Sequence, residues 1–161
     1  MKKYFLIFAA ILLVAQIAHA HSYQLGKIKI GHAWMQELHS TGPEAADNAE
    51  VAAYMPLYNT GEKTDYLIEV KSDWFAQAKF LDLRGTGETG SPQAVFANEI
   101  ALLKGTPIGM QPKSGWRIVF YGVKKPMPKG ETLPVTLVFK NAGSIEVELA
   151  LDPEKPSHQS N

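Results

Sequence analysis

Residues 133–151, LPVTLVFKNAGSIEVELAL, decide the class of fold. Two segments rich in apolar and β-branched residues, 133–139 and 144–151, flank the turn signal Asn141-Ala142-Gly143. In the second segment, apolar residues at 145, 147, 149 and 151 alternate with glutamates at 146 and 148. Successive side chains of a strand point to opposite faces, so this alternation predicts a strand with one buried face.

Further short strand-like segments recur between this stretch and the amino terminus, separated by glycine and proline. They are residues 27–30, 50–58, 66–70, 78–83, 95–97 and 116–123. Residues 73–78 carry a weaker signal, for a helical turn. Many short strands without an amphipathic helix indicate a β-sandwich or barrel, and we predict an all-β sandwich of short, mostly antiparallel strands.

The composition excludes several classes of function. Hydrophobic residues make up 45% of the 161 residues and charged residues 20%, as in an ordinary soluble domain. The 16 Lys and Arg residues balance 16 Asp and Glu residues, so the chain lacks the basic excess typical of nucleic-acid binding. The absence of cysteine excludes disulfides, thiolate metal sites and cysteine nucleophiles. Any metal must therefore be held by His, Met, carboxylate, backbone or amino-terminal groups.

The first 20 residues are typical of a secretory signal peptide. A basic Met1-Lys2-Lys3 start and an apolar run lead to Ala18-His19-Ala20, an A-x-A cleavage site. The apolar run is shorter than the roughly 20 residues that span a bilayer, and no cysteine is present for lipoprotein attachment. We predict cleavage after Ala20, export to the periplasm without a membrane anchor, a domain at residues 21–151 and a flexible polar tail at 152–161.

The order of motifs along the chain resembles the PCu(A)C-type periplasmic copper chaperones. The resemblance covers residues 27 to 150, and its stretches are GHAW (31–34), VAAYMPLYNTG (51–61), TDYL (64–67), KSGW (113–116), YGVKKP (121–126), KGETLPVTLVF (129–139) and NAGSIEV (141–147). This resemblance implies a cupredoxin-like β-sandwich. It also implies copper handling, or delivery towards the copper centres of a respiratory oxidase, with an oxidase subunit or an assembly factor as partner.

The residues that bind Cu(I) in that family are not matched in this chain. The resemblance implies two His and two Met ligands, a soft set that selects Cu(I). The first His position falls at Asp82, and the first Met position falls within residues 94–96, which hold no methionine. The His-x-Met pair falls at Arg117 and Val119. We therefore predict a degenerate family site that does not bind Cu(I) tightly.

The residues at these positions carry opposite charges. We hypothesise that Asp82 and Arg117 form a salt bridge in the vacated site and that Val119 fills the space of a thioether. The alternative is that Asp82 and Arg117 are two solvated surface charges.

Histidines and a methionine elsewhere in the chain are further candidate metal ligands. Cleavage after Ala20 gives His21 both an imidazole and a free amine, two nitrogen donors that suit Cu(II). In this hypothesis a second imidazole, from His32 or His39, completes the site; the alternative is a flexible first residue without a metal. For His32 by itself we expect a partly buried histidine with a backbone partner rather than a metal ligand, because a lone histidine carries little information. Met35 and His39 form a soft pair in an expected loop.

The sequence lacks the common catalytic motifs. It has no Gly-x-Ser-x-Gly elbow, no His-Glu-x-x-His helix and no phosphate-binding loop ahead of a helix, so we do not expect an enzyme. We predict a copper chaperone-like protein with a degenerate primary site. The two rival hypotheses are a metal-free periplasmic interaction module and Cu(II) binding through His21.

Overall fold

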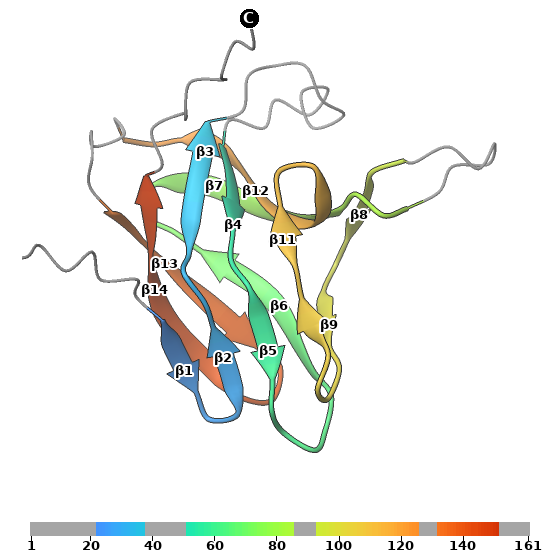
Figure 1. The fold of residues 1–161 in the computed structure, drawn as a ribbon. Helices are drawn as coiled ribbons and strands as arrows, with labels where there is room; N and C mark the ends of the chain where they lie inside the picture. The colour runs from blue at the N-terminus through green and yellow to red at the C-terminus, as the bar shows by residue number, and fades with distance from the viewer. Residues whose placement is uncertain (1–21, 38–50, 86–92, 126–131, 152–161) are drawn as a thin grey trace, which may run out of the picture.

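The strands form two sheets around one core (Figure 1). The structure, a computed structural model, describes residues 22–37, 51–85, 93–125 and 132–151. In these residues the smaller sheet has the order β1 (Tyr23–Leu25), β2 (Ile28–Ile30), β5 (Leu57–Asn59) and β10 (Pro107–Ile108). The larger sheet has the order β8 (Val95–Ala97), β7 (Phe75–Asp82), β12 (Ser114–Val123), β4 (Val51–Tyr54), β3 (Trp34–Glu37), β14 (Gly143–Leu151), β13 (Thr132–Phe139), β6 (Asp65–Lys71) and β9 (Ile100–Leu102), with β11 (Met110–Gln111) paired to β12.

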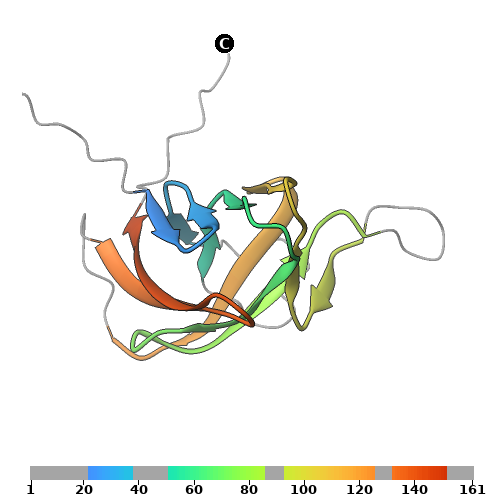
Figure 2. The same ribbon diagram turned by 90° about the horizontal axis from the view of Figure 1, so that it is seen from below.

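The larger sheet curves into a nearly closed barrel (Figure 2). Its middle is the pairing of β3 with β14, the only parallel pair of strands in the described residues. There Ala150 is opposite Trp34, and the N–H of Ala150 donates to the carbonyl of Ala33 at 3.0 Å. Near the ends of the sheet, β6 and β7 are joined by residues 72–74 alone. This short connection brings the two ends of the sheet back together.

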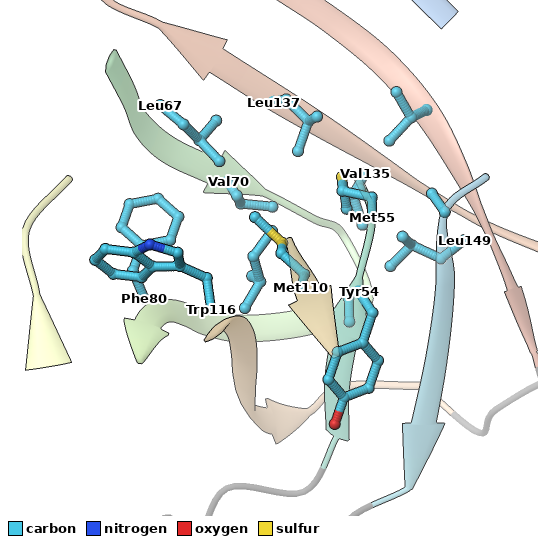
Figure 3. Packing of buried hydrophobic residues seen from close by; sticks show 14 of the residues in the cluster. Tyr54, Met55, Leu67, Val70, Phe80, Met110, Trp116, Val135, Leu137 and Leu149 are labelled. Atoms are coloured by element: carbon cyan, nitrogen blue, oxygen red, sulfur yellow. The ribbon is translucent and has the colours of Figure 1, made fainter. Parts of the chain in front are cut away.

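One hydrophobic core fills the space inside the two sheets. Ile28, Ile30 and Leu57 contribute from the smaller sheet, each at most 2% exposed. Figure 3 shows Met110 and Trp116 pointing into the same cluster as residues of β13 and β14. Each large aliphatic or aromatic side chain buried in this way stabilises the fold by about 1.5–3 kcal/mol.

The prediction for residues 133–151 is confirmed. β13 and β14 pair antiparallel along their whole length, from Thr132 opposite Ala150 to Phe139 opposite Gly143. The predicted buried face is also present, since Val147 and Leu149 are fully buried. The described residues are strands and connections, so the all-β prediction is confirmed as well.

Two expected elements differ from the structure. Residues 73–78, expected as a helical turn, include the start of β7, because β12 pairs with β7 from Phe75 to Asp82. Residues 50–58 are expected as one strand, but within the described part of this range 51–54 form β4 and 57–58 begin β5, in different sheets. The break falls at Pro56, which has no N–H to donate to a strand pair.

Several sequence predictions concern residues outside the described ranges. These are the signal peptide at 1–20, the tail at 152–161, and the histidines His21 and His39, which all stay predictions. Among the described residues, no helix is long and apolar enough to cross a lipid bilayer.

A buried carboxylate ties the start of β6 to the turn between β13 and β14. Asp65 is 6% exposed. Its Oδ1 accepts hydrogen bonds from the backbone N–H groups of Tyr66 at 2.7 Å and Asn141 at 2.9 Å, and from Nδ2 of Asn141 at 3.2 Å. Its Oδ2 accepts from the N–H of Ala142 at 2.8 Å. These donors satisfy both carboxylate oxygens, so the burial of Asp65 leaves no oxygen without a partner.

We expect Asp65→Asn to lower the free energy of unfolding by about 2 kcal/mol. The NH2 group of asparagine cannot accept a hydrogen bond, so one of the backbone N–H groups that now bind the carboxylate would lose its acceptor. Urea denaturation of both proteins measures this difference. Asp73→Asn is the matched control: Asp73 is exposed, and its replacement is expected to change stability by less than about 0.5 kcal/mol. Equal losses for the two variants would contradict the structural role of Asp65.

We expect Gly115→Ala to destabilise the protein more than Gly26→Ala. Both glycines have left-handed φ angles, of 78° and 58°, which cost a residue with a Cβ about 1–2 kcal/mol. A Cβ on Gly115 would also lie 2.5 Å from the carbonyl oxygen of Gly109, whereas a Cβ on Gly26 meets nothing within 4 Å. Thermal or urea unfolding of the two variants tests the difference, and equal losses would show that the contact with Gly109 is relieved without strain.

Candidate functional site

Three neighbouring strands carry the positions expected for the family copper site. β8, β7 and β12 are consecutive in the larger sheet. Asp82 of β7 lies opposite Val95 of β8 on one side and Trp116 of β12 on the other. Positions far apart in the sequence, 82, 94–96 and 117–119, therefore meet at one end of the sheet. Their chemistry decides whether a metal can bind there.

Asp82 and Arg117 lie on opposite faces of the sheet. In the register of β7 and β12, Arg117 is opposite Leu81, and Asp82 is opposite Trp116. Residues opposite one another share a face, whereas successive residues alternate. Asp82 instead binds Arg84, accepting hydrogen bonds from its Nε at 2.9 Å and its Nη2 at 3.0 Å. The hypothesis of a salt bridge between Asp82 and Arg117 is therefore wrong.

The pairing with Arg84 fixes the charge state of Asp82. The side-chain hydrogen bonds from Arg84 hold the pKa of Asp82 below its ordinary value, against the smaller opposing effect of burial. The same bonds raise the pKa of Arg84. A lowered carboxyl pKa contributes stability at neutral pH that is lost as the pH falls through the lowered value. Arg84 also lies over the ring of Trp116, with its Cζ 5.4 Å from the centroid.

Arg84 is not among the residues singled out from the sequence. The signal for it is the spacing Asp82-Leu83-Arg84, because the carboxylate of an aspartate can accept a hydrogen bond from the backbone N–H two residues on, as Asp82 does from Arg84 in the turn that follows β7. Asp82 is therefore a carboxylate already occupied by a bidentate guanidinium partner. Such a carboxylate is a poor metal ligand, because a metal ion would have to displace Arg84.

Arg117 and Val119 offer no metal-binding atoms either. Nη2 of Arg117 donates to the carbonyl of Pro112, in the turn between β11 and β12. The side chain of Val119 is fully buried, and its filling of the space of a thioether stays a prediction. A guanidinium and an isopropyl group replace the imidazole and thioether that Cu(I) prefers.

On the face of the sheet that carries Arg117 and Val119, a lysine lies between two aromatic rings. Nζ of Lys79 lies 5.0 Å from the ring centroid of Phe96 and 4.8 Å from that of Tyr121. Lys79 is opposite Val119 in the register, so it shares the face of Arg117 and Val119. At the expected positions the three strands thus carry a valine, two cations and a carboxylate paired with Arg84, rather than the imidazoles and thioethers that Cu(I) prefers.

A second region, around His32, lies at the parallel pairing of β3 and β14. The side chain of His32 is exposed, so the expectation of a partly buried histidine is wrong. It borders a pocket of about 250 Å³ whose other walls are Trp34, Ala150 and Leu151. The ring of Trp34 packs against Tyr54 with a centroid distance of 4.5 Å. His32 is thus an accessible imidazole next to a largely apolar pocket.

Met35 lies away from this pocket. It belongs to β3 rather than to a loop, and its side chain is 1% exposed in the core. This placement favours packing over metal binding. β3 also carries the chain about 10 Å from Trp34 to Glu37, away from His32. Within the described residues, no three His, Cys, Asp or Glu side chains gather into a metal site.

The chain is similar to known copper-related domains. Residues 28–151 match a family described as LpqE-like, a lipoprotein family. The copper-bound PCuAC domain from PmoF2 is 26% identical, with a TM-score of 0.66 over 82% of this chain and 97% of that chain. The apo PCuAC domain from PmoF1 is 25% identical, with a TM-score of 0.61 over 82% of this chain and 98% of that chain.

A more distant structure shares the fold. The solution structure of CuI-DR1885 from Deinococcus radiodurans is 19% identical, with a TM-score of 0.54 over 88% of this chain and 87% of that chain. No curated protein sequence matches the chain. The expected cupredoxin-like fold is thus confirmed. Since the family match extends over most of the sequence and the matched structures are PCuAC domains, the chain belongs to the LpqE-like family of PCuAC-type domains.

Proposed function

We propose that this protein handles copper outside the cytoplasm and binds it as Cu(II) at the mature amino terminus. Membership of the family and the similarity to a copper-bound PCuAC domain support a copper function. The bidentate pair of Asp82 with Arg84 and the buried Val119 argue against the usual Cu(I) position. The metal therefore needs another set of ligands in this chain.

The register of β1 and β2 is the observation that carries the proposal. Tyr23 is opposite Ile30, Gln24 opposite Lys29 and Leu25 opposite Ile28. His21 precedes Tyr23 by two residues, and His32 follows Ile30 by two residues. His21 and His32 are thus the residues two positions beyond the paired Tyr23 and Ile30, and we propose that they share a copper ion.

This arrangement supplies the ligands that Cu(II) prefers. Cleavage after Ala20 gives His21 an amine and an imidazole, and His32 adds an exposed second imidazole. The walls of the adjacent pocket, Trp34, Ala150 and Leu151, offer no competing ligand side chain. Transfer then proceeds by ligand exchange on the open side of His32, and the recipient we propose is a copper centre of a respiratory oxidase or its assembly factor.

A Cu(II) competition titration of the mature protein, beginning at His21, tests the proposal. We expect one tight equivalent. His21→Ala and His32→Ala are each expected to weaken it by more than about 100-fold, because loss of a direct ligand exceeds the 10–100-fold effect of an outer-shell partner. One extra residue before His21 should weaken binding similarly, because it removes the α-amine from the chelate.

His39→Ala is the matched control, since it removes an imidazole outside the proposed set. Unchanged affinity in the His21 or His32 variant would contradict the proposed ligands, and loss of binding in the His39 variant would replace His32 by His39. Circular dichroism of each variant shows whether the fold is retained.

The metal-free interaction module is the second candidate, and the side chains at the family copper position favour it. For either candidate, we expect a Cu(I) competition assay to find no tight binding that depends on residues of β7 or β12. Asp82→Ala and Arg117→Ala should leave any Cu(I) binding unchanged within about twofold. A large loss in either variant would place a Cu(I) ligand set at that end of the sheet; absence of both Cu(I) and Cu(II) binding would establish the metal-free candidate.

A further inference from the structure

β6 and β7 are consecutive strands that do not pair with one another. Residues 72–74 join them, and each uses one edge for another neighbour, β13 for β6 and β12 for β7. On their remaining edges, β9 covers only residues 65–67 of β6, and β8 covers only residues 80–82 of β7. Within the described residues, 68–71 and 75–79 therefore keep one strand edge without a paired strand.

A cleft of about 300 Å³ separates these two edges. Its walls are residues 69–72 and 75–78, together with Phe120 and Lys124. The floor is apolar: Phe75 and Phe120 are buried, with ring centroids 4.6 Å apart. Figure 1 shows β6 and β7, the two strands that supply most of the residues lining this cleft, running apart from one another.

Unpaired strand edges are a recognised means of binding extended peptides. Their free N–H and C=O groups pair with an added strand, and neighbouring pockets accept its alternate side chains. The open stretch of β7 corresponds to about 15 Å at the rise of a strand, the length of four to five extended residues. The cleft therefore matches a short extended segment in size, whereas a stable folded partner needs a far larger interface.

The charges around the cleft determine the chemistry of the segment. Lys71 and Glu69 form an exposed pair at 3.4 Å that largely cancels, and Asp73 lies in the turn beside them. Lys124 lines the cleft without an acidic partner among the described residues, and Lys125 follows it, its Nζ 5.3 Å from the ring centroid of Trp74. The lysine side of the cleft thus favours a carboxylate.

We propose that this cleft binds an extended, acidic segment of a partner protein by strand addition between β6 and β7. The segment pairs its backbone with the open edge of β7 and places an apolar side chain over Phe75 and Phe120. One of its carboxylates contacts Lys124. This interaction is independent of copper, since none of the proposed metal ligands lines the cleft.

Selection of phage-displayed octapeptides on the mature protein tests this proposal. We expect enrichment of sequences that alternate Asp or Glu with Val, Ile or Thr. A selected peptide, synthesised and added to the protein, should protect amide hydrogens within residues 68–71 and 75–79 from exchange. Lys124→Glu should weaken its binding about tenfold or more, and Lys113→Glu, an exposed charge reversal outside the cleft, should leave it unchanged.

Three outcomes would overturn the proposal. The first is slow hydrogen exchange, in the free protein, of the amides of residues 75–79 that point away from β12. This result would mean that another part of the chain or a second copy covers the edge. Protection by the peptide at other strands would place binding elsewhere. Failure of the library to yield any peptide sensitive to Lys124→Glu would exclude strand addition in the cleft; circular dichroism of the variant confirms that it remains folded.

Discussion

The pairing of β3 with β14 is the constraint on which the rest of the structure depends. It joins the series β8, β7, β12, β4 and β3 to the series β14, β13, β6 and β9, and without it the larger sheet would be two separate sheets. The same pairing sets Ala150 and Leu151 beside Trp34 and so builds the pocket next to His32. The pairing that joins the two halves of the larger sheet therefore also forms the pocket beside His32.

The sequence is informative where the pattern that specifies a strand is local. β13 and β14 are predicted within one residue at each boundary, because alternating apolar residues and an Asn-Ala-Gly turn lie within one short stretch. The start of β7 is not predicted from the sequence. Ala76 and Gln77 are consecutive exposed residues, so the alternation of buried and exposed side chains that marks a strand is broken there. The strand conformation of this segment comes from β12, which is more than 30 residues further along the chain.

In the candidate sites, too, local sequence features are predictable, whereas features that depend on distant strands are not. Resemblance to a family brings the correct strands together at Asp82 and Arg117 but does not determine which face each side chain occupies. A shift of one residue in a strand moves a side chain to the other face, and this is the difference between Leu81 and Asp82 as the neighbour of Arg117. The exposure of His32 depends equally on non-local contacts, here with the last residues of β14.

The separation of β6 from β7 has a consequence for the motions of the barrel. Elsewhere in the described sheet, strands can part only by breaking backbone hydrogen bonds, whereas residues 68–71 and 75–79 can move apart by loosening side-chain packing around Phe75. Local opening is easiest where few contacts must be broken. Between β6 and β7 the barrel therefore has the contact that we expect to open at the lowest free-energy cost, since no backbone hydrogen bond between these two strands has to be broken.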